Sequence, residues 1–210
     1  MTRVSATRTL ENVLRKLGFR RVCGVDEVGR GCLAGPVVAG AVVLHPDRHI
    51  AGLSDSKTVP ADERDELFEE ITARALAWGV AEASPTEIDT INIHQASLQA
   101  MRRAVMSLVP LPDVVLVDAF RIPDLMMAQR GVVHGDQRCS AIAAASIVAK
   151  VIRDRQMRQL HEQYPRYGFA RHKGYATAEH LAAVRQFGYS DVHRRSFSPP
   201  TLPLEFDTID

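Results

Sequence analysis

Alternating blocks of apolar and polar positions divide the chain into short strands and amphipathic helices. Two apolar runs, residues 20–27 and 37–44, are joined by a glycine-rich connection, and this pattern predicts two antiparallel neighbouring strands. Residues 78–83, 114–117 and 132–133 predict three further short strands. The run 114–117 is apolar throughout, which is typical of a strand that is buried on both faces.

Apolar residues that recur at spacings of three and four predict helices between these strands. The helices are expected over residues 1–18, 60–77, 92–109, 140–161 and 177–187. Because strands and helices alternate after the first hairpin, we expect an α/β fold with a mixed central sheet flanked by helices. The chain shows no internal repeat or linker, so residues 1–197 are expected to form a single domain, followed by a flexible tail over 198–210.

Composition narrows the class of protein. The 210 residues are 46% hydrophobic and 24% charged, as in a soluble globular domain. No apolar stretch is long enough for a signal peptide or a membrane span, so no membrane partner is expected. The three cysteines form no C-x-x-C pair, which argues against a disulfide framework or zinc site and favours the reducing cytoplasm.

Charge is distributed unevenly along the chain. The net charge is only +1, but residues 150–195 are rich in lysine and arginine. Such a basic segment is typical of a protein that binds a polyanion. A solvated helical surface is the alternative interpretation.

Four carboxylates lie at or just beyond the ends of predicted strands. Asp26 and Glu27 end the first strand, Asp118 follows residues 114–117, and Asp136 lies just beyond 132–133. Functional sites of α/β sheets lie at strand ends, so these acids could converge on one edge. All-oxygen ligands favour Mg²⁺ or Mn²⁺, and such clusters typically catalyse phosphodiester cleavage.

Two observations qualify this metal site. Neighbouring residues of a strand point to opposite faces, so Asp26 and Glu27 can share a metal only where the strand bends or twists. For Asp118 and Asp136 the alternative is an acid that caps a turn.

The glycines that follow the first two acids, Gly29, Gly31 and Gly35, allow three interpretations. A dinucleotide-binding turn is disfavoured, because Pro36 and a β-branched run follow where a helix is required. A tight hairpin with solvated acids remains open. A metal site beside a backbone that a substrate approaches closely also remains open.

The second half of the chain carries further candidate residues. Ser146 and Lys150 form a polar stripe on the alanine-rich helix, where Lys150 contacts a phosphate or pairs with Asp154 four residues later. Tyr175 stacks on a sugar or base, or packs on the last helix. Arg194 and Arg195 fit phosphate contacts, with a solvated surface as the alternative.

Taken together, several segments resemble bacterial ribonuclease HII, and they occur in the order of that family. They are Asp26-Glu-Val-Gly-Arg-Gly31, Asp55-Ser-Lys57, Val117-Asp118, Gly135-Asp136, the segment Ala143 to Asp154, His172-Lys-Gly-Tyr-Ala-Thr177 and His193-Arg-Arg-Ser-Phe197. The resemblance implies an RNase H-like fold with a helical C-terminal part. It also implies cleavage, dependent on Mn²⁺ or Mg²⁺, of the RNA strand of RNA–DNA hybrids and of duplex DNA 5′ of single ribonucleotides, for ribonucleotide removal and primer clearance.

By this resemblance each motif residue has an expected role. The catalytic, metal-binding acids, expected to hold two ions, are Asp26, Glu27, Asp118 and Asp136. The residues expected to read the ribose 2′-hydroxyl are Gly29, Arg30 and Gly31. Tyr175 would pack on the adjacent deoxyribose. The expected phosphate contacts are Lys57, Ser146 and Lys150.

Three positions depart from the family pattern. Cys32 stands where proline is common, and Thr58 and His134 stand where lysine is common. The last two departures could weaken phosphate contacts, and none is a proposed metal ligand. The tail segment Leu202-Pro-Leu-Glu-Phe206 could dock weakly on a partner such as a sliding clamp. Two other functions stay open: a different metal nuclease on the same fold, such as a resolvase or exonuclease, and a non-catalytic nucleic-acid binder.

Overall fold

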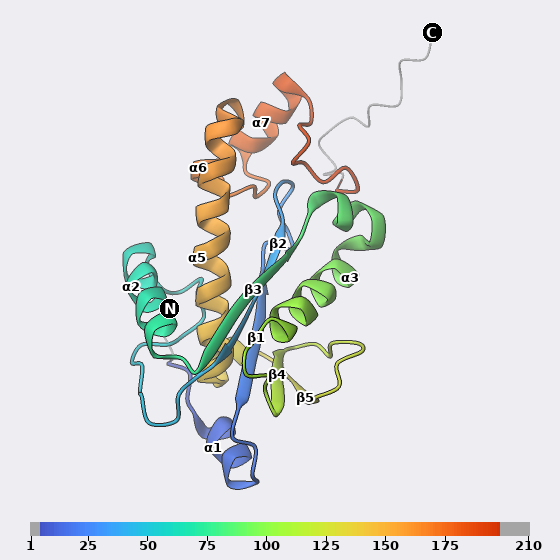
Figure 1. Cartoon of the computed structure of the whole chain (residues 1–210). Helices are drawn as coiled ribbons and strands as arrows, with labels where there is room; N and C mark the ends of the chain where they lie inside the picture. The colour runs from blue at the N-terminus through green and yellow to red at the C-terminus, as the bar shows by residue number, and fades with distance from the viewer. Residues whose placement is uncertain (1–4, 198–210) are drawn as a thin grey trace.

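A five-stranded mixed sheet forms the centre of the computed structural model, which describes residues 5–197 (Figure 1). The strand order is β3-β2-β1-β4-β5. The strands are β1 (Val22–Val28), β2 (Val37–Val43), β3 (Ala77–Ala83), β4 (Val114–Asp118) and β5 (Ala128–Val132). The first three pair antiparallel, whereas β4 and β5 run parallel to β1. The expected mixed sheet and the expected antiparallel hairpin are therefore confirmed.

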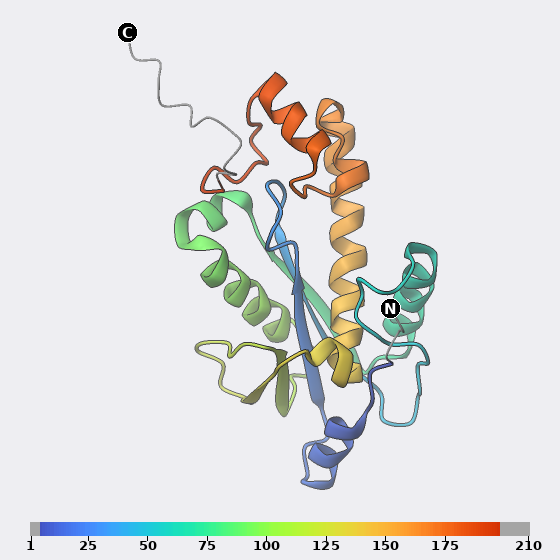
Figure 2. The same ribbon diagram turned by 180° about the vertical axis from the view of Figure 1, so that it is seen from behind.

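Helices cover both faces of this sheet. They are α1 (Thr9–Lys16), α2 (Ala61–Arg74), α3 (Pro85–Met106), α4 (Gly135–Arg138), α5 (Ser140–Gln163), the 3-10 helix η1 (Pro165–Tyr167), α6 (Phe169–His172) and α7 (Ala178–Phe187). Figures 1 and 2 show α3 on one face of the sheet and α5 with α2 on the other. None of the helices within residues 5–197 is long and apolar enough to cross a membrane.

The alanine-rich helix α5 lies directly on the sheet because two glycines face it. A Cβ atom at Gly24 of β1 would lie 2.1 Å from the backbone carbon of Ala141. A Cβ atom at Gly40 of β2 would lie 2.5 Å from the carbonyl oxygen of Ala145. Small residues on both sides therefore bring the helix backbone close to the sheet.

Three predicted elements differ from the structure. The leading helix expected over residues 1–18 spans only Thr9–Lys16 among the described residues. The strand expected over 132–133 is β5, an edge strand that starts at Ala128 and carries polar Gln129 and Arg130. Helix α3 consists of two helices joined at a kink, and the helix expected over residues 92–109 is the second of them. The first begins at Pro85, where Ser84 and Glu87 form a capping box, and it was not predicted. Residue 92 coincides with a kink, at which Asn92 has a φ of 65°.

The C-terminal part packs on the end of α5 and on the connection between β1 and β2. Tyr167, Phe169 and Met157 belong to one buried cluster there. Isolated antiparallel bridges join Cys32 to Tyr175 and Ala34 to His193. The predicted tail and the candidate docking segment at residues 202–206 lie outside the described residues. The single-domain boundary at residue 197 stays a prediction.

Candidate active site

Asp118 is the central member of the four predicted acids. It ends β4, and the pairing of Val25 with Val117 puts it in register with Asp26. The N–H of Gly135 donates to Asp118 Oδ1 at 2.8 Å, which ties the start of α4 to this strand end. Burial raises the pKa values of Asp26, Glu27 and Asp136, and the charge of Asp118 raises all three further. The structure thus brings the four acids within electrostatic range of one another, near the ends of the neighbouring strands β1 and β4.

Asp26 and Glu27 leave β1 toward opposite faces. Asp26 lies on the face of α5, where a hydrogen bond from Ser146 lowers its otherwise raised pKa. Glu27 lies on the other face, and its Oε1 is 3.3 Å from Arg30 Nη1. β1 stays paired with β2 through both acids, so the strand is not interrupted between them. The pairing of β1 with β4, however, ends at Val25 and Val117, so both acids lie just beyond the last pair of these two strands.

The chemistry of these acids fits a divalent cation, although their side chains do not form a closed ligand set. Among residues 5–197, no three His, Cys, Asp or Glu side chains are grouped so that they could hold a metal ion. Glu27 Oε2 is nevertheless buried without a hydrogen-bond partner. A cation between the acids would satisfy this oxygen and relieve their mutual repulsion. Binding would require the side chains to rotate toward one another.

The loop with Asp55-Ser-Lys57 lies beside Asp136. Burial and the charge of Asp55 raise the pKa of Asp136, whereas the exposed Lys57 lowers it. The N–H of Lys57 donates to Asp55 Oδ1 at 3.0 Å, which shapes this turn. The predicted phosphate contact Lys57 is therefore solvent-accessible and close to an acid of the site.

Ser146 and Lys150, the other two predicted phosphate contacts, are bonded to protein groups. Ser146 is buried, and its Oγ lies 2.8 Å from Ser56 Oγ, within hydrogen-bond distance. Lys150 Nζ donates to Asp154 Oδ1 at 2.7 Å, which is the alternative that the i,i+4 spacing offered. A phosphate contact from either residue stays a prediction that requires these bonds to be exchanged.

The glycine-rich turn divides into a packed and an open half. Gly29 has a φ of +93°, and a Cβ there would lie 2.2 Å from Arg153 Nε, so glycine is required by the fold. At Gly31 a Cβ would meet nothing within 4 Å. Between them, the Arg30 guanidinium lies 4.7 Å from the centre of the Phe120 ring. The turn therefore exposes Gly31 and keeps Gly29 against the protein.

Tyr175 lies at the edge of this turn. Its backbone bridges to Cys32, and the residue is 38% exposed. Burial and the neighbouring Cys32 raise the pKa of the Tyr175 hydroxyl. The structure thus joins the turn and the tyrosine, which are far apart in sequence, and places the unusual Cys32 at their contact.

The burial of several polar residues of this region was not predicted from the sequence. Arg153 and Arg194 are both 0% exposed, so the expected phosphate contact of Arg194 is wrong. His172, His180 and His193 form a buried group of rings behind Tyr175. Arginine is mostly exposed in folded proteins, so a local sequence pattern does not predict that these two are buried.

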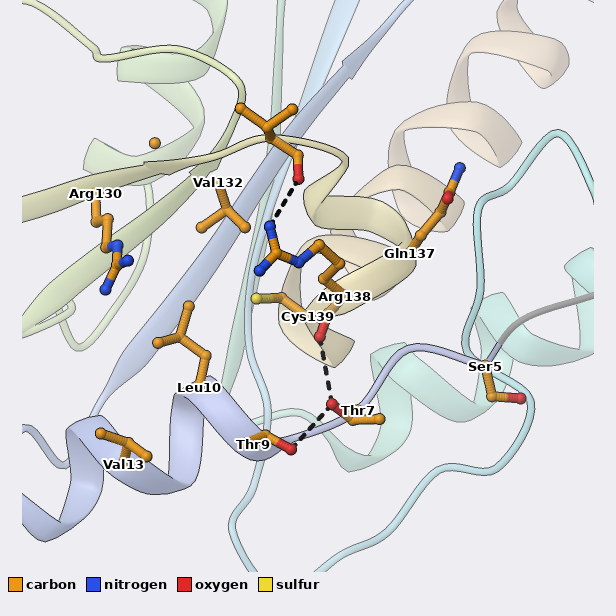
Figure 3. A pocket seen from close by; sticks show the side chains of 12 residues that line it. Ser5, Thr7, Thr9, Leu10, Val13, Arg130, Val132, Gln137, Arg138 and Cys139 are labelled. Carbon is orange, nitrogen blue, oxygen red and sulfur yellow. Dashed lines mark hydrogen bonds between the residues drawn. The ribbon is translucent and has the colours of Figure 1, made fainter.

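A cavity of about 680 Å³ lies between α1, β5 and α4 (Figure 3). Its lining includes Leu10, Val13, Arg130 and Arg138, and Arg138 Nη1 donates to the carbonyl of Val133 at 3.3 Å. None of the predicted site residues lines it. The acids and the open turn therefore define a separate region of the surface.

Known proteins share the sequence of most of this chain. Residues 23–199 match the family model described as Ribonuclease HII. The chain is 56% identical over 188 residues to "Ribonuclease HII" of Polynucleobacter necessarius, an alignment that covers 88% of this chain and 95% of that protein.

Solved structures share the fold. The ribonuclease H2 of Pyrococcus horikoshii superposes with a TM-score of 0.72 at 26% identity, covering 84% of this chain and 93% of that one. Bst-RNase HIII in complex with Mn²⁺ superposes with a TM-score of 0.65 at 20% identity, covering 83% and 65% of the two chains. The RNase H-like fold expected from the sequence is therefore confirmed.

Proposed function

This chain belongs to the ribonuclease HII family, and from that membership we infer that it is a metal-dependent endoribonuclease acting on RNA–DNA hybrids. It cleaves the RNA strand, and it cuts duplex DNA 5′ of single embedded ribonucleotides, leaving 3′-hydroxyl and 5′-phosphate ends. One observation supports this function above others. Asp118 is in electrostatic contact with three buried acids at a sheet edge, and the glycine turn that follows Glu27 is open to solvent and joined to Tyr175.

The proposed metal ligands are Asp26, Glu27, Asp118 and Asp136. Two Mn²⁺ or Mg²⁺ ions would supply an activated water and charge neutralisation at the departing 3′ oxygen. The acids would hold the ions near the end of β4. The N–H of Gly135 fixes the carboxylate of Asp118, the central acid of the group. The orphaned Glu27 Oε2 is the atom of this set with most to gain from a cation.

Recognition of ribose is proposed for the turn and the tyrosine. The 2′-hydroxyl is the group by which a protein distinguishes RNA from DNA. A site that hydrogen-bonds a hydroxyl loses much of its affinity for an analogue without it, because its polar groups are left unpaired. The exposed Gly31 backbone supplies such polar groups, and the half-exposed Tyr175 ring lies beside them to pack on the neighbouring deoxyribose. Lys57 is an exposed cation beside the acids, available to the phosphate backbone.

Cleavage of two matched duplexes tests the function. One duplex carries a single ribonucleotide and the other is entirely DNA, and each is incubated with Mg²⁺, with Mn²⁺ or with a chelator. We expect one cut, 5′ of the ribonucleotide, with metal only. Equal cutting of both duplexes would instead indicate a different metal nuclease.

Replacement of Asp118 by Asn separates catalysis from binding. The substitution removes one charge at the centre of the acids while leaving the basic and aromatic surface intact. We expect turnover to fall by about 100-fold or more, the scale of losing an electrostatic group of an active site, while duplex binding is largely retained. Full activity in this variant would assign the protein to another mechanism.

We also propose a place of action and a partner. Cys23, Cys32 and Cys139 are all unpaired and buried, which supports a reducing compartment such as the cytoplasm. Weak docking on a sliding clamp through residues 202–206 stays a prediction, because these residues lie outside the described part of the chain. Deletion of residues 198–210 should abolish clamp binding in a pull-down if the prediction holds.

A further inference from the structure

Two buried arginines hold the glycine-rich turn through its carbonyl groups. Arg194 donates from Nη1 to the carbonyl of Arg30 at 2.9 Å and from Nε to that of Gly35 at 3.0 Å. Arg153 of α5 donates from Nε to the carbonyl of Pro36 at 2.9 Å and from Nη2 to that of Ala34 at 3.2 Å. The carbonyl side of the turn therefore faces the protein interior.

Arg153 also connects this turn to the segment with Tyr175. Its Nη1 donates to the carbonyl of Lys173 at 2.9 Å, and its guanidinium lies 6.0 Å from the centre of the Tyr175 ring. The same side chain packs against Gly29. One guanidinium thus contacts both elements that are proposed to recognise the sugar.

Neither arginine is placed by an ion pair. Within residues 5–197 no carboxylate is bonded to Arg153 or Arg194, and Arg194 Nη2 is buried without any acceptor. Burial of an unpaired charge is unfavourable, and an apolar side chain could fill the same space without that cost. All five acceptors of these two side chains are backbone carbonyls, and four of them belong to the glycine-rich turn, so both residues are directed at the conformation of its backbone.

The geometry of one peptide group shows what Arg194 does to the turn. In a planar trans peptide the C=O and the N–H point in opposite directions. The Arg30 carbonyl and the Gly31 N–H belong to the same peptide, so the bond from Arg194 directs the Gly31 N–H outward. Gly31 is exposed, and no acceptor for its N–H is found in the described part of the chain.

We propose that Arg194 and Arg153 are positioning residues for ribose recognition, which hold the turn so that the outward Gly31 N–H can bond the 2′-hydroxyl beside Tyr175. This inference rests on the proposed function and adds the residues by which the turn is oriented. Neither guanidinium touches the substrate. Both act through backbone carbonyls.

Substitution of Arg194 by Lys tests this role with the full chain. Lysine keeps the positive charge but cannot bond the Arg30 and Gly35 carbonyls in the same fork geometry. The measured quantity is the ratio of the dissociation constants for an all-DNA duplex and for the same duplex with one ribonucleotide, in the presence of chelator. We expect this ratio to fall by up to about tenfold, the scale of one lost hydrogen bond. Arg158→Lys, at an exposed position of α5, is the control that should keep the ratio.

A double-mutant cycle shows whether Arg194 acts through the turn. Gly31→Ala blocks the approach of the sugar, so adding Arg194→Lys should reduce the ratio little further. Additive effects, or an unchanged ratio in Arg194→Lys, would overturn the positioning role. Wild-type protein that cuts both duplexes equally would overturn the proposed function and this inference with it.

Hydrogen exchange provides a second measurement that requires no variant. The Gly31 amide should exchange rapidly in the free protein and become protected by the ribonucleotide duplex but not by the all-DNA duplex. A Gly31 amide that is already protected in the free protein, or that both duplexes protect equally, would contradict the outward orientation or its use.

Discussion

The buried histidines behind Tyr175 make the stability of the C-terminal part depend on pH. His180 Nδ1 lies 2.9 Å from the carbonyl of Tyr175, so this nitrogen is assigned the proton. His180 Nε2 must then accept, at 3.1 Å, from His193 Nε2. His193 Nδ1 accepts from the N–H of Ser190 at 3.0 Å. Each ring is thereby held in its neutral form. A second proton on either ring would place two N–H groups against each other.

The size of the effect follows from two lowered pKa values. Burial lowers the pKa of His180 and of His193 from 6.5 to about 4. Their contribution to stability is complete above pH 6.5 and is lost as the pH falls toward 4, because only the unfolded chain takes up these protons in that range. At about 1.4 kcal/mol per pH unit, each ring contributes a loss of about 2 kcal/mol at pH 5.

Urea unfolding at pH 7.5 and pH 5 measures this loss. In the wild type the free energy of unfolding should fall by about 4 kcal/mol from these two rings. His193→Gln keeps a side-chain N–H near His180 but cannot take up a proton, so its loss should be about 2 kcal/mol smaller. His49→Gln, at an exposed position, should leave the difference between the two pH values unchanged. An equal loss in wild type and His193→Gln would refute the reasoning.

Three further predictions follow from close contacts. Gly29→Ala should lower the free energy of unfolding by about 1–3 kcal/mol, because of the positive φ of Gly29 and its contact with Arg153. Gly31→Ala should instead keep the melting temperature and lose selectivity for ribose. Equal melting temperatures for the two variants would contradict this. Gly24→Ala should cost about 3 kcal/mol or more, since α5 must move off the sheet, and chemical denaturation with little change would show that the helix relaxes. Asp26→Asn in chelator should raise the free energy of unfolding by about 1 kcal/mol and remove the thermal shift produced by Mn²⁺; a retained shift would exclude Asp26 as a ligand.

The elements that were predictable from the sequence are those with a strong apolar pattern. Residues 37–44 and 114–117 are continuous apolar runs, and both are buried strands. By contrast, β5 contains Gln129 and Arg130, and as an edge strand it needs no apolar run. The first turns of α3 were missed although Ser84 and Glu87 carry a capping-box spacing, because that segment has no long apolar stripe.

The candidate site was predictable by residue type but not by contact. Carboxylates at strand ends pointed to the edge at Asp118, and the structure brings the four acids there. The partners of these residues depend on tertiary packing, which a local pattern does not encode. The pairing of Lys150 with Asp154 was one of two alternatives at that spacing, and the burial of Arg194 ran against the usual exposure of arginine.

Helix α5 fixes the distance between the acids and the glycine-rich turn. Ser146 bonds to Asp26, and Arg153, about two turns later, holds the glycine turn, a separation of about 10 Å along a rigid helix. Insertion of one residue between them would rotate Arg153 by about 100° and remove it from the turn. In the proposed function, the offset between the recognised sugar and the cleaved phosphate would therefore be set by the length of α5, and a different offset would require a different helix.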